Sequence, residues 1–212
     1  MIQIDDAGSG SLIGGTCIAA LRTDTNEYYS EIIPVFLFNR ENFKYKFYIY
    51  YTTEIIKNAL KKLKVDKNEA ISICQGYIFE DARQYLAENN YNYSSTKIID
   101  PLQSIIEKNF ENYAVSLGLP REFILYTKYP FHFHRLLKWV YADFENRVNI
   151  CKTGWKSWDK YSNLETNIYY DKILRSHYVC LKCGKRIENG SSVKVIKYKT
   201  TSINYIYTHK NC

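Results

Sequence analysis

Two pairs of metal-binding residues lie at the end of the sequence. Cys180 and Cys183 are separated by two residues, and His209 and Cys212 repeat that spacing further along the chain. Zn²⁺ prefers a tetrahedron of sulfur and nitrogen ligands, and a two-residue gap lets both cysteines reach one ion. Because four protein ligands leave no open coordination position, the pattern predicts a structural zinc ion.

The segment between these pairs is expected to form a β-hairpin. Residues 193–198 and 202–207 are rich in β-branched and aromatic side chains, which favour strands. A hairpin would return the second ligand pair to the first, and Gly184 permits a tight turn after Cys183. The spacing resembles treble-clef or ribbon-like zinc modules. The alternative is an incidental C-x-x-C with an unrelated His and Cys. A redox C-x-x-C is disfavoured, because no thioredoxin-like βαβ unit surrounds it.

Two adjacent carboxylates lie near the start of the chain. Asp5 and Asp6 end an apolar strand-like run and precede the glycine-rich residues 7–10. Neighbouring strand residues point to opposite faces, so both carboxylates reach one site only where the strand gives way to the turn. Carboxylate oxygens suit Mg²⁺ or Mn²⁺. An ordinary acidic turn is the alternative interpretation.

The elements that must position these residues follow from the hydrophobic pattern. It predicts strands at 1–5, 15–22, 28–38, 70–76 and 97–99, and helices at 43–64, 78–88, 101–118 and 131–148. Thr52 or Thr53 is expected to cap the main part of the first helix. Residues 149–170 have no clear periodicity. The order β-β-β-α-β-α-β-α indicates an α/β fold with a mixed sheet and flanking helices.

The opening segment resembles a known family. Residues 4–14, Ile-Asp-Asp-Ala-Gly-Ser-Gly-Ser-Leu-Ile-Gly, are similar to the motif Asp-Glu-Ala-Gly-Arg-Gly-Pro-Leu-x-Gly that opens type 2 ribonucleases H. The Ala19-Ala20 pair in the next apolar run also matches. The predicted element order independently resembles the ribonuclease H fold. The resemblance covers about the first 120 residues.

The resemblance implies catalytic roles for four positions. Asp5 matches the first catalytic Asp of the family, and Asp6 matches its Glu. Gln75 stands where a third carboxylate is usual, and Asp100 matches the fourth. Glutamine contributes no charge, so other carboxylates are expected to compensate if the site is active. The candidates for that role are Glu54, Glu80, Asp81 and Asp143.

The resemblance also implies contacts with nucleic acid. Gly8, Ser9 and Gly10 match the Gly-Arg-Gly that contacts the 2′-hydroxyl of an RNA strand in the family. Ser9 replaces the arginine, which puts in doubt the preference for ribonucleotides within DNA.

The charge balance is basic. The chain of 212 residues carries a net charge of +7, which favours anionic partners such as nucleic acid, or else a basic solvated surface. Cations alternate with aromatic rings in residues 147–160, a composition that tracks phosphates and stacks bases; core tryptophans are the alternative. The residues expected to contact nucleic acid there are Lys152, Trp155, Lys156 and Trp158, with a second stripe at Lys194, Lys197 and Lys199.

We therefore expect three parts: a ribonuclease H-like domain at 1–125, an aromatic and basic helical extension at 126–173, and a zinc module at 174–212. The predicted function is a divalent-metal-dependent nuclease acting on RNA/DNA hybrids or structured nucleic acid by two-metal catalysis. The alternatives are an inactive nucleic-acid-binding protein of the same fold and a zinc-stabilised protein-interaction module. The sequence lacks a secretory pattern and a long apolar run, so we expect a soluble cytoplasmic protein.

Overall fold

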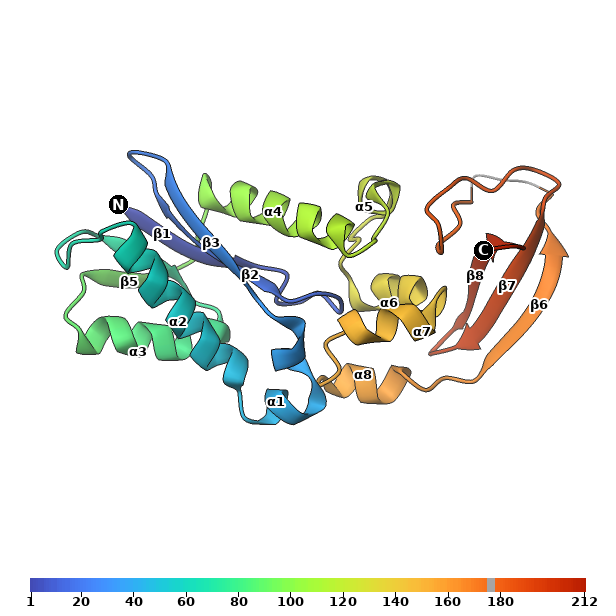
Figure 1. Ribbon diagram of the computed structural model, residues 1–212, viewed down its shortest axis with the longest axis horizontal. Helices are drawn as coiled ribbons and strands as arrows, with labels where there is room; N and C mark the ends of the chain where they lie inside the picture. The colour runs from blue at the N-terminus through green and yellow to red at the C-terminus, as the bar shows by residue number, and fades with distance from the viewer. Residues whose placement is uncertain (175–177) are drawn as a thin grey trace. The chain divides into compact units, whose positions relative to one another are not determined.

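The computed structural model describes residues 1–174 and 178–212, and the chain divides into two compact units (Figure 1). The first unit comprises residues 1–9 and 14–113. The second comprises residues 10–13 and 114–212. Residues 175–177, which fall within the expected zinc module, lie outside the described residues. Among the described residues, no helix is long and apolar enough to cross a membrane.

The first unit is built on a mixed sheet of five strands in the order β3-β2-β1-β4-β5. The first three strands pair antiparallel, whereas β4 runs parallel to β1 and β5 parallel to β4. This is the strand order of the ribonuclease H fold, and it confirms the predicted fold class. The strands are β1 (Ile2–Ala7), β2 (Thr16–Arg22), β3 (Glu27–Ile33), β4 (Ile71–Cys74) and β5 (Tyr93–Thr96).

Helices flank this sheet. One apolar core joins buried residues of α2 and α3 to Ile2, Ile4 and Ile73 on the sheet. On the other side of β1, Gln3 accepts a hydrogen bond from the backbone amide of Leu102, where α4 begins. Figure 1 shows α4 across the sheet from α2 and α3. The helices are α1 (Arg40–Lys44), α2 (Phe47–Lys62), α3 (Glu80–Glu88) and α4 (Leu102–Ser116), with short 3₁₀ turns η1 (Val35–Phe38) and η2 (Tyr77–Phe79).

Several local predictions in this unit are wrong. The strand expected over 28–38 ends at Ile33, and Val35–Phe38 form a 3₁₀ turn. The long helix starts at Phe47, after Lys46 adopts a left-handed backbone conformation (φ 56°). Thr52 and Thr53 are buried inside α2, where their hydroxyls donate to carbonyls four residues back, so neither is a cap. The last strand is the polar β5 rather than the apolar residues 97–99.

The second unit combines short helices with a three-stranded antiparallel sheet in the order β6-β7-β8. The strands β7 (Ser192–Lys199) and β8 (Ile203–His209) confirm the predicted hairpin. The helix expected over 131–148 is instead interrupted after Tyr141. The helical segments are α5 (Arg121–Tyr126), α6 (Phe133–Tyr141), α7 (Phe144–Arg147), η3 (Val148–Ile150) and α8 (Lys156–Tyr161).

The strand β6 (Thr166–Lys172) has no counterpart in the sequence prediction. All seven of its residues are exposed, so it carries no buried stripe that would give the apolar alternation of a half-buried strand. It pairs with β7 along its whole length. This strand, which lies in the expected extension, therefore belongs to the same sheet as the predicted hairpin.

Buried side chains lie on both faces of β7, the central strand of this sheet. Ile196, Tyr198 and Ile206 pack in one core with the apolar face of α6, and the Tyr141 and Tyr198 rings stack 4.9 Å apart. Val193 and Val195 belong to a second core with Cys180. The fold thus anchors one cysteine of the ligand pattern in the interior.

Candidate metal centres

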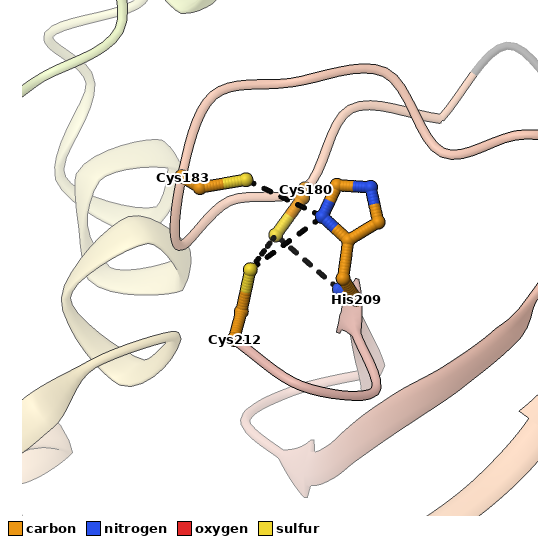
Figure 2. A group of neighbouring side chains, drawn as sticks. All are labelled: Cys180, Cys183, His209 and Cys212. Carbon is orange, nitrogen blue, oxygen red and sulfur yellow. Dashed lines mark hydrogen bonds between the residues drawn. The ribbon is translucent and has the colours of Figure 1, made fainter.

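The C-terminal ligand pattern forms a cluster in the second unit (Figure 2). His209 ends β8, Cys212 lies three residues beyond it, and Cys180 and Cys183 flank a tight turn. The three sulfur atoms and a ring nitrogen of His209 all lie within 4.8 Å of one another. The hairpin therefore brings together residues that are far apart in the sequence.

The spacing of these atoms fits a tetrahedral zinc ion. The Sγ atoms of Cys180 and Cys212 are 3.9 Å apart, and Nδ1 of His209 lies 3.3 Å from Cys183 Sγ and 3.5 Å from Cys212 Sγ. A tetrahedron with ordinary Zn–S and Zn–N bond lengths has edges of about 3.8 Å between sulfurs and about 3.6 Å between sulfur and nitrogen. The cluster is consistent with a structural zinc site.

The groups around the cluster orient its ligands. Nε2 of His209 lies 3.0 Å from the carbonyl oxygen of Arg186. Since a carbonyl only accepts, Nε2 carries the proton and Nδ1 keeps its lone pair toward the sulfurs, the usual outer-shell arrangement of a ligating histidine. The backbone amide of His209 also donates to Cys180 Sγ at 3.4 Å.

The turn that carries Cys180 and Cys183 is closed by Gly184, and this position requires glycine. Gly184 has φ +76°, and its amide donates to the carbonyl of Cys180 at 2.8 Å. A Cβ at this position would lie 2.9 Å from the Cβ of Pro120. Backbone conformation and close packing therefore both exclude a larger residue.

A buried arginine braces the same turn. The guanidinium of Arg147 donates to the carbonyls of Leu181 (2.9 Å) and Lys182 (2.8 Å), the two residues between the cysteines. It also lies over the Trp139 ring, 3.8 Å from its centroid. Burial lowers the pKa of Arg147 to about 10, so the group stays charged at neutral pH. A fixed cation therefore stands beside a cluster that becomes anionic when its thiols ionise.

The N-terminal carboxylates form a second cluster, in the first unit. Ile4 of β1 pairs with Ile73 of the parallel β4, so Asp5 and Cys74 follow that pair at the same end of both strands. Ligand atoms of Asp5, Asp6 and Cys74 lie within 4.8 Å of one another. The amide of Asp6 donates to the Asp5 carboxylate at 2.9 Å. The structure thus brings Asp5 and Asp6 together at the end of β1.

The acidic groups of this cluster are partly buried and lie close together. Burial raises the pKa of Asp5, and the charge of Glu107 on α4 adds to that effect. Burial, together with both aspartates, raises the pKa of Cys74 to about 11, so its thiol is neutral at pH 7. A cation placed among these groups would oppose each of these shifts.

No protein-family model and no curated protein matches this chain. The ribonuclease H-like assignment therefore rests on the sheet order and on the position of Asp5 and Asp6 within it.

Among the described residues, Asp100 does not belong to the cluster of Asp5, Asp6 and Cys74. Asp100 is exposed and accepts hydrogen bonds from the amide and hydroxyl of Ser104, at 3.1 and 2.6 Å, at the start of α4. Gln75 is also exposed, and its amide nitrogen lies 3.5 Å from the carbonyl of Ser95 on β5.

Cys74 and Glu107 are the cluster neighbours that sequence reasoning missed. The parallel pairing of β1 and β4, which the sequence does not reveal directly, aligns Cys74 with Asp5. Glu107 lies four residues after Gln103 on α4, and the two side chains are hydrogen-bonded. The sequence shows this helical spacing, but it does not show that the charge of Glu107 acts on Asp5.

None of the proposed replacement carboxylates belongs to the acidic cluster among the described residues. Glu54 pairs with Lys57 at 2.8 Å, and Asp143 of the second unit pairs with Lys182 at 3.1 Å. Glu80 and Asp81 lie in the first turn of α3, where carboxylates suit the helix dipole.

The glycine-rich turn after β1 has a packing function at its first position. Gly8 has φ +86°, and a Cβ there would lie 2.1 Å from the Phe110 ring of α4. Ser9 and Gly10 are exposed. The backbone conformation and the close contact with α4 therefore both explain the glycine at position 8.

The basic and aromatic segment 147–160 is partly core. Lys152 is fully buried with its ammonium 5.4 Å from the centre of the Trp155 ring, and Trp158 is 6% exposed and stacked on Phe144. Lys152 and Trp158 thus belong to the core, as in the alternative interpretation, and are not exposed for contact with nucleic acid. Lys156 is exposed and Trp155 half-buried. On β7, Lys199 is exposed whereas Lys194 and Lys197 are half-buried.

Proposed function

We propose that this protein is a divalent-metal-dependent nuclease of ribonuclease H-like type, acting on RNA-containing or structured nucleic acid. One observation carries the proposal: Asp5 and Asp6 converge with Cys74 at the carboxyl ends of β1 and β4, in the middle of a sheet with ribonuclease H strand order. The net charge of +7 supports a polyanionic substrate.

The donor set fits a hard cation held with water. Mg²⁺ is commonly bound through one or two carboxylates together with substrate phosphates, and Asp5 and Asp6 offer two. When bound, such an ion polarises a phosphate and lowers the pKa of its water. The protein orients the Asp5 carboxylate, because it accepts a hydrogen bond from the amide of Asp6.

A cleavage assay tests the proposal directly. The purified chain is incubated with RNA/DNA hybrid, RNA and DNA in Mg²⁺ or Mn²⁺. We expect Asp5→Asn and Asp6→Asn to reduce cleavage by more than about 100-fold, the upper range for loss of a group outside the ligand shell. Asp171→Asn is the matched control, because Asp171 is an exposed carboxylate on β6. Absence of cleavage of every substrate by the unaltered chain would sink the proposal.

A second variant tests the position implied by the family resemblance. Asp100→Ser keeps a side-chain oxygen that can accept the Ser104 amide at the start of α4, but it removes the charge. Because Asp100 lies outside the cluster, activity that survives in Asp100→Ser and is lost in Asp5→Asn would limit the catalytic set to the cluster itself.

A catalytically inactive nucleic-acid-binding protein is the second candidate. It is favoured by Cys74, a neutral thiol in a cluster where a third anionic ligand would help to hold metal. This candidate predicts gel shifts that weaken steeply with salt, without cleavage. A protein that neither cleaves nor binds nucleic acid would instead be a zinc-stabilised interaction module.

We also propose that Cys180, Cys183, His209 and Cys212 hold one structural zinc ion. The geometric fit and the proton on Nε2 of His209 support it. Elemental mass spectrometry should find about one zinc per chain. Folded protein purified without zinc would refute this proposal.

A further inference from the structure

Four large aromatic side chains of the first unit are exposed in one region. They are Tyr45, Phe47, Tyr50 and Tyr77, with 62%, 47%, 63% and 57% of their surface accessible. We call them the aromatic surface. The rings of Tyr45 and Phe47 are 5.5 Å apart, and Phe47 and Tyr50 lie one turn apart on α2 and so share a side of the helix. Grouped exposed apolar surface of this kind marks an interaction site.

A chain of contacts connects the aromatic surface to the acidic cluster. Tyr48, next to Phe47, has its ring edge-to-face with Tyr77 at 6.2 Å. Tyr77 directly follows Gly76, where a Cβ would lie 3.9 Å from Asp6 Oδ1 and 3.6 Å from Cys74 Sγ. Tyr77 is therefore the member of the aromatic surface next to the candidate catalytic carboxylates.

The Tyr77 ring packs against an ordered aromatic group. Tyr48, whose ring meets Tyr77 edge-to-face, is buried and stacks on Phe38 and Phe43, with centroid distances of 5.1 Å each. Packing of Tyr77 on this group limits the conformational entropy that is lost when another flat group stacks on its exposed face.

The charges beside the aromatic surface suit a phosphate backbone. Arg40, Lys44 and Lys46 are exposed beside Tyr45 and Phe47, where Glu41 is the one exposed acid of residues 40–50. Two further exposed acids, Glu80 and Asp81, follow Tyr77 at the start of α3. The Lys44 ammonium lies 4.7 Å from the centre of the Tyr45 ring. Cations interleaved with rings are the composition that binds single-stranded nucleic acid, since each base can stack and each phosphate can pair.

We infer that the aromatic surface binds the unpaired bases of a single-stranded nucleic acid and leads that strand to Asp5 and Asp6. Bases in a duplex are stacked on each other and present no free face, whereas splayed bases do. The inference deepens the proposed nuclease function by naming its substrate as a single strand or a duplex with an unpaired flank. Binding itself does not require the site to be active.

Fluorescence anisotropy of labelled oligonucleotides tests the binding. The full chain is titrated with a single strand and with a blunt duplex of equal length, in Ca²⁺ and using Asp5→Asn so that no cleavage interferes. We expect the single strand to bind more tightly, and Tyr77→Ala or Phe47→Ala to weaken it by at least about fivefold, the lower bound for one stacked base. Tyr77→Phe keeps the ring and should retain affinity.

Matched controls separate stacking from general effects. Tyr170→Ala removes a ring of similar exposure from the second unit, and Tyr126→Ala removes a more exposed one. Both variants should bind as the parent does. The thermal midpoint of each variant checks that it folds. Strands carrying 5-iodouracil should crosslink to the tryptic peptides 47–57 and 68–83, which contain Phe47, Tyr50 and Tyr77.

Three outcomes would overturn the inference. They are equal binding of duplex and single strand, equal losses in the control variants, and unchanged affinity in Tyr77→Ala, which a protein partner for this surface would produce. Single-strand binding without cleavage by the unaltered chain would leave the inference standing and remove the nuclease proposal. Cleavage that is unchanged in Tyr77→Ala and Phe47→Ala would support the nuclease proposal and overturn the inference about the aromatic surface.

Discussion

The Arg147 guanidinium donates to the carbonyl of Leu181 at 2.9 Å, inside the turn that carries Cys180 and Cys183. This contact, with the one to Lys182, ties the metal cluster to the helical part of the second unit. We predict that Arg147→Met destabilises the protein by about 3 kcal/mol, because the buried carbonyl of Trp139 and the part-buried carbonyls of Leu181 and Lys182 lose a charged donor. Urea unfolding measures the change, and a chelator competition should show weaker zinc binding.

Arg186→Met is the control for this prediction. Arg186 is an exposed arginine near the same turn, and its backbone carbonyl, which accepts from His209, survives the substitution. Equal destabilisation by Arg186→Met and Arg147→Met would show that the buried guanidinium has no special role.

Loss of single zinc ligands should be distinguishable from loss of other cysteines. We predict that Cys180→Ala abolishes stoichiometric zinc and lowers the thermal midpoint, because Cys180 is both a proposed zinc ligand and part of the core with Val193 and Val195. Cys151→Ala removes a cysteine of similar burial outside the cluster. It should retain about one zinc per chain, and zinc loss in Cys151→Ala would contradict the assignment.

The sequence predicts well those features that depend on local spacing. Cys180, Cys183, His209 and Cys212 are recognisable because each pair has a two-residue gap and the hairpin between them has strong strand propensity. Asp5 and Asp6 are likewise recognisable from adjacent residues. The order of strands and helices along the first unit matches the prediction, because the apolar pattern indicates which segments face a core and with what period.

Features that depend on tertiary contacts are not readable in the same way. Cys74 joins Asp5 through the register of two parallel strands, and Glu107 faces Asp5 from a helix about 100 residues later. Lys152 lies in a basic stretch of the kind usually found on the surface, but its side chain is fully buried. The strand β6 has no buried stripe, so only its pairing with β7 defines it.

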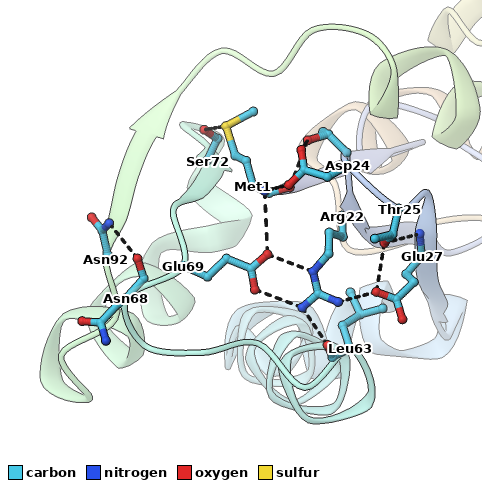
Figure 3. Close-up of polar contacts among 11 residues, drawn as sticks. Met1, Arg22, Asp24, Thr25, Glu27, Leu63, Asn68, Glu69, Ser72 and Asn92 are labelled. Atoms are coloured by element: carbon cyan, nitrogen blue, oxygen red, sulfur yellow. Dashed lines mark hydrogen bonds and ion pairs between the residues drawn. The ribbon is translucent and has the colours of Figure 1, made fainter.

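The ion pair between Arg22 and Glu69 predicts a pH dependence of stability (Figure 3). Arg22 Nε and Nη2 each donate to one oxygen of Glu69 at 2.9 Å, and Nη2 also donates to the Leu63 carbonyl. These bonds to Arg22 lower the pKa of Glu69 in the folded state. A lowered carboxyl pKa means that the stabilisation is complete above the unfolded value, about 4.3, and is lost as the pH falls through the folded value.

We therefore predict that Glu69→Gln lowers the free energy of unfolding by about 1 kcal/mol at pH 7. The difference from the unaltered chain should shrink as the pH falls below about 4. Urea titrations across this pH range measure it. Glu54→Gln is the control, because both partners of its ion pair with Lys57 are more than a third exposed, and it should change little. A Glu69→Gln effect independent of pH would exclude the ion pair as its cause.

The thiol of Cys74 predicts how the acidic cluster responds to a third carboxylate. In Cys74→Asp, three carboxylates would share a space where ligand atoms lie within 4.8 Å, so repulsion should destabilise the metal-free protein by about 1–2 kcal/mol. Mg²⁺ binds only the folded site and should stabilise this variant more than the unaltered chain.

Thermal unfolding with and without Mg²⁺ measures both effects of Cys74→Asp without relying on activity. The midpoint should fall by about 2–8 °C in the absence of metal and recover as Mg²⁺ is added. Cys74→Ser is the matched control, since it replaces the neutral thiol with a neutral hydroxyl and should lack the Mg²⁺-dependent recovery. A Cys74→Asp variant that Mg²⁺ does not stabilise would show that Asp5, Asp6 and residue 74 do not bind a common ion.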